Sequence, residues 1–325
     1  MRILFKIFVF IVILILLNVF YGCKKDFYVV NDESEHCECE PYINLQDYNP
    51  DYIEITDTSS VFAAEYNPLN NDEIIFLKLE SNIRNMYRFN LVTHQKYLIG
   101  SFPVIQSFDW GKNDWILLEL GDLNVWKMKS NGDSLIQLTS GKPYFHPKWN
   151  FNSTKISVFY YINPMEEHGE ILTADGLFYD SIMDPTIYNS CLYSSWRNSS
   201  EMMISYQSPS EIRVVDLNQK IVLKEKIFNS IYNITQVEWL NDNEAIVNSA
   251  YGLYKYNFQT NSIVKLRCQC PQLLYQKIRA NIEGNKLLMT RVLYEQIDTS
   301  FYFNIKYEIV ELDLETMIET VIDVN

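Results

Sequence analysis

Cysteines are the residues of this sequence whose type and spacing most directly suggest chemistry. The chain has 325 residues and six cysteines, which are Cys23, Cys37, Cys39, Cys191, Cys268 and Cys270. Four of them form two Cys-x-Cys pairs, and in an exported protein such pairs favour disulfides. Four thiolates also suit a structural zinc ion, although paired zinc ligands are usually further apart in sequence. We therefore predict disulfides among Cys37, Cys39, Cys268 and Cys270, with a metal site or free thiols as the alternatives.

Groups of acids, bases and nucleophiles are sparse. The sequence contains no Gly-x-Ser-x-Gly nucleophile elbow, no His-Glu-x-x-His motif and no glycine-rich phosphate loop. Its densest titratable cluster is Glu166, Glu167, His168 and Glu170. Carboxylates beside a histidine raise its pKa, which would suit acid–base or metal chemistry, but the position between two expected strands favours a solvated hairpin tip. We predict no catalytic residue, no metal ion and no cofactor.

The N-terminus has the features of an export signal. Arg2 and Lys6 precede an unbroken apolar run from Ile7 to Leu17, and Gly22-Cys23 follows. A basic start, a short apolar stretch and a small residue describe a signal peptide, whereas a membrane span needs about 20 apolar residues. Cys23 resembles the lipid-modified cysteine of bacterial lipoproteins, and the alternative is an uncleaved anchor helix.

From this resemblance we expect residues 1–22 to be a lipoprotein signal peptide and residues 23–58 to be a lipidated tether arm. The arm is acidic and rich in turn formers, which is typical of a loop. The protein would then lie in a bacterial cell envelope, outside the cytoplasm and anchored by Cys23 to a membrane, with the outer membrane favoured.

Charge argues against a nucleic-acid partner. The chain has 27 basic and 41 acidic residues, a formal net charge of −14, and nucleic-acid binding depends mainly on neutralisation of phosphates by Lys and Arg. Hydrophobic residues make up 47% of the chain and aromatic residues 14%. That composition supplies a large core and favours strands.

An aromatic residue, a polar turn and an apolar strand recur along the chain. The clearest copy is PKWNFNSTKISVF (147–159), in which Trp149 precedes a turn of Asn, Ser and Thr and then a β-branched run. This order is typical of two antiparallel strands joined by a tight turn. The expected anchor positions, 39 to 47 residues apart, are Tyr66, Trp110, Trp149, Trp196, Trp239 and Asn281.

A strand-rich repeat of this length predicts a propeller blade rather than a unit of a helical solenoid. Each interval carries a further apolar run that ends at Asn, Asp or Gly, such as MYRFNL (86–91), so that four strands fit each repeat. We predict an all-β fold in which residues 59–325 form a six-bladed β-propeller of four-stranded antiparallel blades. The repeated tryptophans are expected to pack between neighbouring blades.

The clearest repeat resembles the blade of TolB-like propellers, which also occurs in the propeller domains of prolyl oligopeptidases. The match lies in the order Pro-x-Trp, polar turn, Ile-x-aromatic, carried by Pro147, Trp149, Asn152, Ile156 and Phe159. The resemblance covers about residues 59–325. It implies an interaction module, because TolB-like relatives act as such, and the chain has no residues left over for a hydrolase domain.

We therefore expect a non-enzymatic propeller that binds a protein or peptide at one face or in its central funnel, since the loops of a propeller are free to vary. The alternatives are an envelope enzyme with an active site in the central channel, such as a glycan lyase or hydrolase, and a sensor that binds a glycan or small ligand. Three or more ionisable side chains that meet at the axis would favour catalysis, and a wide apolar funnel would favour a peptide.

Overall fold

The computed structural model describes residues 59–163, 166–182, 191–206, 210–228, 234–269, 273–296 and 303–324. The predicted signal peptide, the tether arm, Cys23, Cys37, Cys39 and Cys270 lie outside these residues. In the described ranges no helix is long and apolar enough to cross a membrane.

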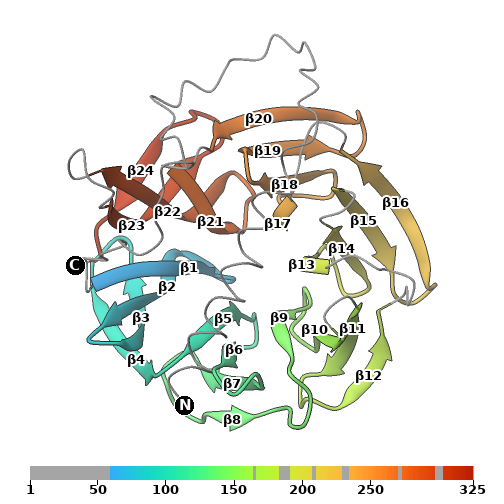
Figure 1. Ribbon diagram of the computed structural model, residues 1–325, viewed down its shortest axis with the longest axis horizontal. Helices are drawn as coiled ribbons and strands as arrows, with labels where there is room; N and C mark the ends of the chain where they lie inside the picture. Colours follow the sequence, from blue (N-terminus) through green and yellow to red (C-terminus); the bar gives the residue numbers. More distant parts are fainter. Residues whose placement is uncertain are drawn as a thin grey trace, which may run out of the picture. The chain divides into compact units, whose positions relative to one another are not determined.

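The described residues form six separate four-stranded antiparallel sheets arranged as blades around one axis (Figure 1). Blade 1 contains β1 (Ser59–Asn67), β2 (Asn70–Glu80), β3 (Ile83–Asn90) and β4 (Lys96–Phe102), and blade 2 contains β5 (Ile105–Trp110), β6 (Trp115–Leu120), β7 (Val125–Lys129) and β8 (Ile136–Gln137). Blade 3 contains β9 (Phe145–Trp149), β10 (Lys155–Asn163), β11 (Glu166–Thr173) and β12 (Phe178–Ser181), and blade 4 contains β13 (Cys191–Trp196), β14 (Glu201–Tyr206), β15 (Glu211–Asp216) and β16 (Ile221–Ile227). Blade 5 contains β17 (Ile234–Trp239), β18 (Glu244–Ser249), β19 (Gly252–Asn257) and β20 (Ser262–Cys268), and blade 6 contains β21 (Leu273–Ala280), β22 (Lys286–Gln296), β23 (Phe303–Asp313) and β24 (Glu319–Ile322).

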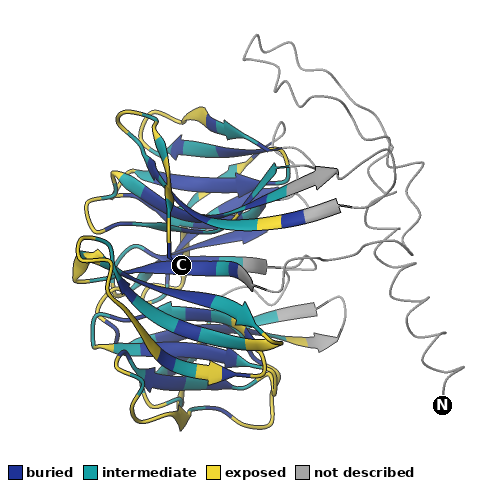
Figure 2. Ribbon diagram, turned by 90° about the vertical axis from the view of Figure 1, so that its left-hand side faces the viewer, coloured by how far each residue is buried: buried dark blue, intermediate teal, exposed yellow. Residues whose placement is uncertain are grey.

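The predicted all-β six-bladed propeller is confirmed. In every blade the four strands pair in sequence order, and the first strand of each lies nearest the axis (Figure 1). The second strands are apolar almost throughout because both of their faces are covered by neighbouring blades, as the burial of β6 and β18 shows. The fourth strands, such as β16, lie at the perimeter and are largely exposed (Figure 2).

Asparagine side chains organise the turns between first and second strands. Asn150 Oδ1 accepts hydrogen bonds from the backbone N–H of Thr154 (2.8 Å) and Lys155 (2.9 Å). Asn281 Oδ1 plays the same part in blade 6, at 3.0 Å from the N atoms of both Asn285 and Lys286. These bonds explain the recurrent polar turn, because an Asn side chain replaces a missing backbone acceptor.

This comparison corrects the expected anchor of blade 6. Trp149 pairs with the first residue of the second strand's apolar run, Ile156, and in blade 6 the corresponding pair is Ala280 with Leu287. Asn281 is therefore the equivalent of Asn150, and the anchor position is Ala280. The prediction was one residue out because Asn281 is conspicuous in the sequence, whereas a small anchor is not.

The hydrophobic core is divided into clusters, each of which joins two adjacent blades. Trp149 of blade 3 packs on Leu117 and Val125 of blade 2, and Trp239 of blade 5 packs on Met203 and Val214 of blade 4. The predicted packing of tryptophans between blades is thus confirmed at these positions. These contacts between blades bury apolar surface and also fix the position of each blade relative to the next.

The ring closes between blade 6 and blade 1 without an exchanged strand among the described residues. Blade 6 is completed by its own β24, so that the C-terminal segment, rather than the arm, supplies its outer strand. The junction, which we call the seam, is held by side chains. Ile309 and Val324 pack against Ile74, and the Tyr66 hydroxyl donates to Glu311 Oε2 at 2.7 Å.

Candidate functional site

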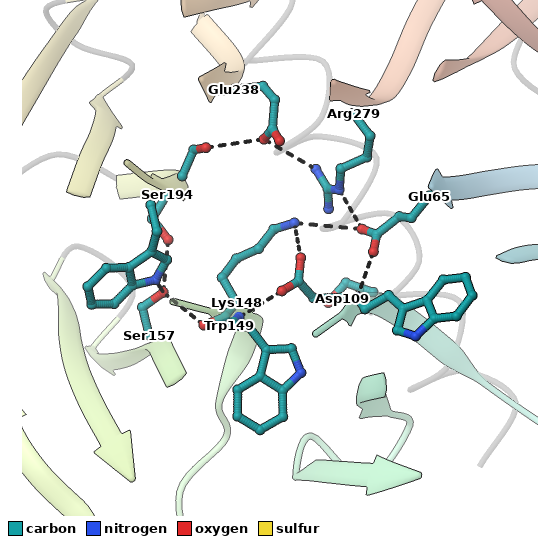
Figure 3. Close-up of polar contacts among 12 residues, drawn as sticks. Glu65, Asp109, Lys148, Trp149, Ser157, Ser194, Glu238 and Arg279 are labelled. Carbon is teal, nitrogen blue, oxygen red and sulfur yellow. Dashed lines mark hydrogen bonds and ion pairs between the residues drawn. The ribbon is translucent and has the colours of Figure 1, made fainter. Parts of the chain in front are cut away.

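The residue immediately before each anchor points to the axis of the ring. Successive residues of a strand face opposite sides, so an anchor that enters a blade interface directs its neighbour to the place where the six inner strands converge. Figure 3 shows most of these side chains around the axis. We call this set the axis layer, and it consists of Glu65, Asp109, Lys148, Ser195, Glu238 and Arg279.

Ion pairs link the charged members of the axis layer. Lys148 Nζ lies 2.5 Å from Asp109 Oδ1 and 3.6 Å from Glu65 Oε1. Arg279 Nε lies 2.5 Å from the same Glu65 oxygen, and its Nη1 lies 3.9 Å from Glu238 Oε2 (Figure 3). The chain of contacts therefore crosses five of the six blades.

The axis layer also joins each blade to the next through the backbone. Glu65 Oε2 accepts from the N–H of Trp110 at 2.9 Å, and Asp109 Oδ2 accepts from that of Trp149 at 2.7 Å. In blade 4 the acceptor is Ser195 Oγ, 3.2 Å from the N atom of Trp239. In these blades the side chain before the anchor thus accepts a hydrogen bond from a backbone N–H of the following blade. That N–H group would otherwise be buried without a partner.

Burial shapes the titration of the axis layer. It raises the pKa of Asp109 and the pKa of Glu238. For Arg279, burial alone would lower the pKa, but Glu65, Glu238 and Asp109 raise it above the usual arginine value. All three carboxylates have a cationic partner, and such a compensated set is stable only while it stays complete. The axis layer therefore serves to hold blades together.

A second layer lies two residues earlier on each inner strand. All six of its members line one cavity, together with parts of the axis layer. The cavity measures about 20 Å³, enough for one or two water molecules. We call these six residues the socket, and they are Ala63, Ser107, His146, Tyr193, Gln236 and Lys277.

His146 and Lys277 occupy the socket in a left-handed backbone conformation, each with φ of 52°. Both lie where β9 and β21 carry an extra residue relative to their partner strands. Such a bulge re-aims a side chain, and a left-handed residue other than Gly, Asn or Asp stores about 1 kcal/mol or more of strain. The two residues come from blades 3 and 6, which stand opposite each other in the ring (Figure 1).

Lys277 makes no short ion pair, although Glu119 and Glu65 are near enough to favour its charged form. In the described part of the chain its Nζ makes no ion pair or hydrogen bond, and its nearest aromatic contact is the ring of Tyr193, 6.0 Å away. Burial and the nearby Arg279 lower the pKa of Lys277 to about 8. The amine is therefore mostly charged at neutral pH, and burial makes that charge unfavourable.

The rest of the socket offers aromatic surface and one unused polar atom. The rings of His146 and Tyr193 lie 4.6 Å apart, and Nδ1 of His146 is buried without a hydrogen-bond partner. Burial and the neighbouring Lys277 lower the pKa of His146 to about 3, so its imidazole is neutral. Beside it, Glu119 accepts from the His146 N–H at 3.0 Å and from Ser107 Oγ at 2.6 Å, and burial raises the pKa of this carboxyl group.

An aromatic row leads from the surface to the socket. Tyr161 on β10 is 46% exposed, and its ring stacks on Phe145 with centroids 4.7 Å apart. Phe145 in turn meets His146 edge to face at 5.4 Å. The row therefore connects an exposed tyrosine with the cavity that contains Lys277.

Replacement of Lys277 by Met is expected to stabilise the folded protein by about 1–3 kcal/mol, because it removes a cation that makes no ion pair and whose charged form the surrounding protein disfavours. The folded pKa of about 8 is below the ordinary lysine pKa of 10.5, so the penalty is full below pH 8 and fades as pH rises toward 10.5. Urea titrations of wild type and Lys277→Met at several pH values measure both effects. Lys224→Met on the perimeter strand β16 is the control, for which we expect no comparable gain.

The acidic cluster that the sequence singled out lies on strand β11, whose first residue, Glu166, pairs with Asn163 at the β10–β11 hairpin. The cluster therefore begins at the hairpin and continues into the sheet. The buried carboxylate of Glu170 accepts from Lys142 Nζ (2.7 Å) and from the Tyr144 hydroxyl (2.5 Å). Burial alone would raise the pKa of Glu170, but these hydrogen bonds hold it below its usual value. Glu170 is thus a packing residue of blade 3.

The cysteine predictions fall mostly outside the described residues. Cys268 ends β20 and is disulfide-bonded, while the side chains of the other five cysteines are not described, so the pairing stays a prediction. Among the described residues no group of three or more His, Cys, Asp or Glu side chains could hold a metal ion.

Sequence reasoning missed both the axis layer and the socket. The signal was present, because the residue before each anchor is charged or polar in every blade once the anchor of blade 6 is placed at Ala280. With Asn281 as the anchor, the preceding residue is alanine and Arg279 falls out of the pattern.

Comparison with known proteins places the fold but not the family. No protein-family profile matches the chain, and no curated protein sequence is significantly similar to it. Among solved structures, a putative TolB from Agrobacterium tumefaciens is similar with a TM-score of 0.59 and 9% identity, over 74% of this chain and 88% of that one. A nidogen/laminin complex gives a TM-score of 0.54 and 8% identity, over 66% of this chain and 81% of that one. The protein is therefore a six-bladed propeller with a TolB-like fold.

Proposed function

We propose that this protein is an envelope lipoprotein, anchored through Cys23, whose propeller is a non-enzymatic module for binding a protein or peptide at its axis. The observation that carries this proposal is the division of the axis into two layers. The axis layer binds its own charges to one another and to backbone N–H groups, whereas the socket leaves a cation and aromatic rings available to a ligand.

Several ionisable side chains do meet at the axis, which is the arrangement expected of the alternative, an enzyme with a central active site. A catalytic acid or base must be able to exchange a proton with its substrate. Glu65 and Asp109 instead accept backbone donors and ion-pair partners, and a pKa of about 3 makes the imidazole of His146 a weak base. This occupation of the carboxylates favours binding over catalysis.

Similarity of fold adds limited support. One structure with a similar fold is a nidogen/laminin complex, and a propeller presents its connecting loops on a rigid ring, which suits protein recognition. Loops of this kind can change without disturbing the blades. The partner is thus expected to contact loops at one face as well as the axis.

The test is crosslinking and purification of the protein from intact bacterial envelopes, compared with Cys23→Ala. The wild type is expected to incorporate a fatty-acid analogue, to sediment with membranes and to recover a specific partner. Cys23→Ala should lose the lipid label and remain soluble, because its only proposed anchor is removed. Lipid labelling of Cys23→Ala would contradict the anchor. Failure of the wild type to recover a partner, together with turnover of a glycan or peptide, would favour the enzyme.

A further inference from the structure

Resting on the proposed binding function, we propose that the socket receives the C-terminal carboxylate of a peptide chain, which pairs with Lys277 Nζ. The first reason is charge. Each cation of the axis layer already has carboxylate partners, and Lys277 has none among the described residues. An ammonium that faces this cavity without an ion-pair partner is free to bind a ligand anion.

Backbone geometry gives the second reason. Lys277 is held in a left-handed conformation at a bulge, and His146 is held in the same conformation across the axis. Backbone strain of this kind persists where surrounding structure enforces it, and it clusters at ligand sites. His146 lines the same cavity, and its Nδ1 is buried without a hydrogen-bond partner.

The size of the ligand follows from the cavity. About 20 Å³ accommodates a group no larger than a carboxylate. The axis layer, with its ion pairs across five blades, borders the cavity, and a space of this size cannot hold a continuous chain. A ligand that enters the socket must therefore end there, which a chain terminus does.

The charge of the ligand is limited by the neighbours of Lys277. Facing it are Arg279 on its own strand, Lys148 and the neutral His146 on β9, Glu65 on β1, Glu119 on β6 and Tyr193 on β13. Both of the other cations are paired with carboxylates, and Glu119 repels anions. A carboxylate adds one negative charge to this set, whereas a phosphate dianion would add two and meet more repulsion from Glu65 and Glu119. The aromatic row beyond His146 then offers stacking surface to the residues before the terminus.

The experiment uses an array of random decapeptides tethered through their N-termini, each synthesised with a free and with an amidated C-terminus. The purified full-length protein is expected to bind the best free-carboxylate peptides at least tenfold more strongly than their amides. Lys277→Met should reduce this ratio to one, and Lys224→Met, which removes the same charge from the perimeter, should leave it unchanged. Binding should weaken as pH rises above 8, because the ammonium loses its proton.

Equal binding of free and amidated peptides, or a ratio that survives Lys277→Met, would overturn the inference. Amidated peptides with an internal Glu that bind as strongly as free termini would also overturn it, since the carboxylate would then come from a side chain. If Lys277→Met still recovers the same envelope partner as wild type, the socket inference fails while the interaction function stands.

Discussion

Replacement of Arg279 by Met is expected to lower the free energy of unfolding by about 3–5 kcal/mol, which is the usual loss when one member of a buried ion pair is removed. The guanidinium is the partner of Glu65 at 2.5 Å and of Glu238 at 3.9 Å. Without it, Glu65 and Glu238 lose their shared cation, and Lys148, which already pairs with Asp109, is the remaining positive charge beside Glu65. Urea denaturation at neutral pH measures the loss.

Arg197→Met is the matched control. Arg197 pairs with Glu201 at 2.8 Å and with Asp242 at 3.4 Å, but the Asp242 side chain is 84% exposed, so we expect a loss of about 1 kcal/mol or less. Adding Glu65→Gln to Arg279→Met should restore part of the stability, because it removes a stranded charge. The deficit of Arg279→Met should also shrink in acid, where the carboxylates take up protons. Equal effects of the two arginine variants would show that the axis layer contributes nothing special to stability.

Truncation of Trp149 to Ala is expected to destabilise the protein by about 3–5 kcal/mol, as for other large aromatic side chains in well-packed cores. The side chain is 5% exposed, and its indole N–H donates to the carbonyl of Trp115 at 3.1 Å. The fit is close, since a Cβ on Gly111 would lie 2.7 Å from Trp149 Cδ1. Thermal and urea unfolding measure the loss.

Two variants locate the origin of that loss. Trp149→Phe keeps most of the apolar volume but removes the indole donor, and we expect about half the effect of Trp149→Ala. Trp126→Ala deletes the same side chain at a partly exposed position, where the indole N–H reaches Asp122 at 3.2 Å, and we expect roughly 1 kcal/mol. A loss for Trp126→Ala as large as for Trp149→Ala would contradict the assignment of Trp149 to an essential blade interface.

The architecture could be predicted from the sequence because blade packing demands a recognisable residue at a regular place. Trp149 and Trp239 fill equivalent gaps between neighbouring blades, and the turn that follows needs Asn or a similar residue to accept backbone hydrogen bonds. Size and turn chemistry therefore repeat with the blades. Blade 6 follows the rule less visibly, since its anchor is only an alanine.

The axis layer could not be recognised as a sequence repeat, because its residues complement one another in charge and are not of one type. A carboxylate in one blade requires a cation in another, so Glu65, Asp109, Lys148 and Arg279 share a position but no common side chain. A high local density of acidic residues was misleading, because it does not show which residues meet at the axis. Glu170 stands in the richest acidic cluster, yet it is bound to Lys142 and Tyr144 within its own blade. Partners at the axis are defined by the ring and cannot be read from neighbours in sequence.

The side-chain seam between blades 6 and 1 has a consequence for assembly. Each blade is a contiguous segment of the chain. A ring that opens at the seam would therefore expose one surface on blade 1 and a complementary surface on blade 6. In a concentrated solution those surfaces can meet on different molecules as readily as on one. Loss of the Glu65–Arg279 pair would then lead to interlocked dimers or open chains of propellers, which is a route to aggregation that a strand shared across the junction would prevent.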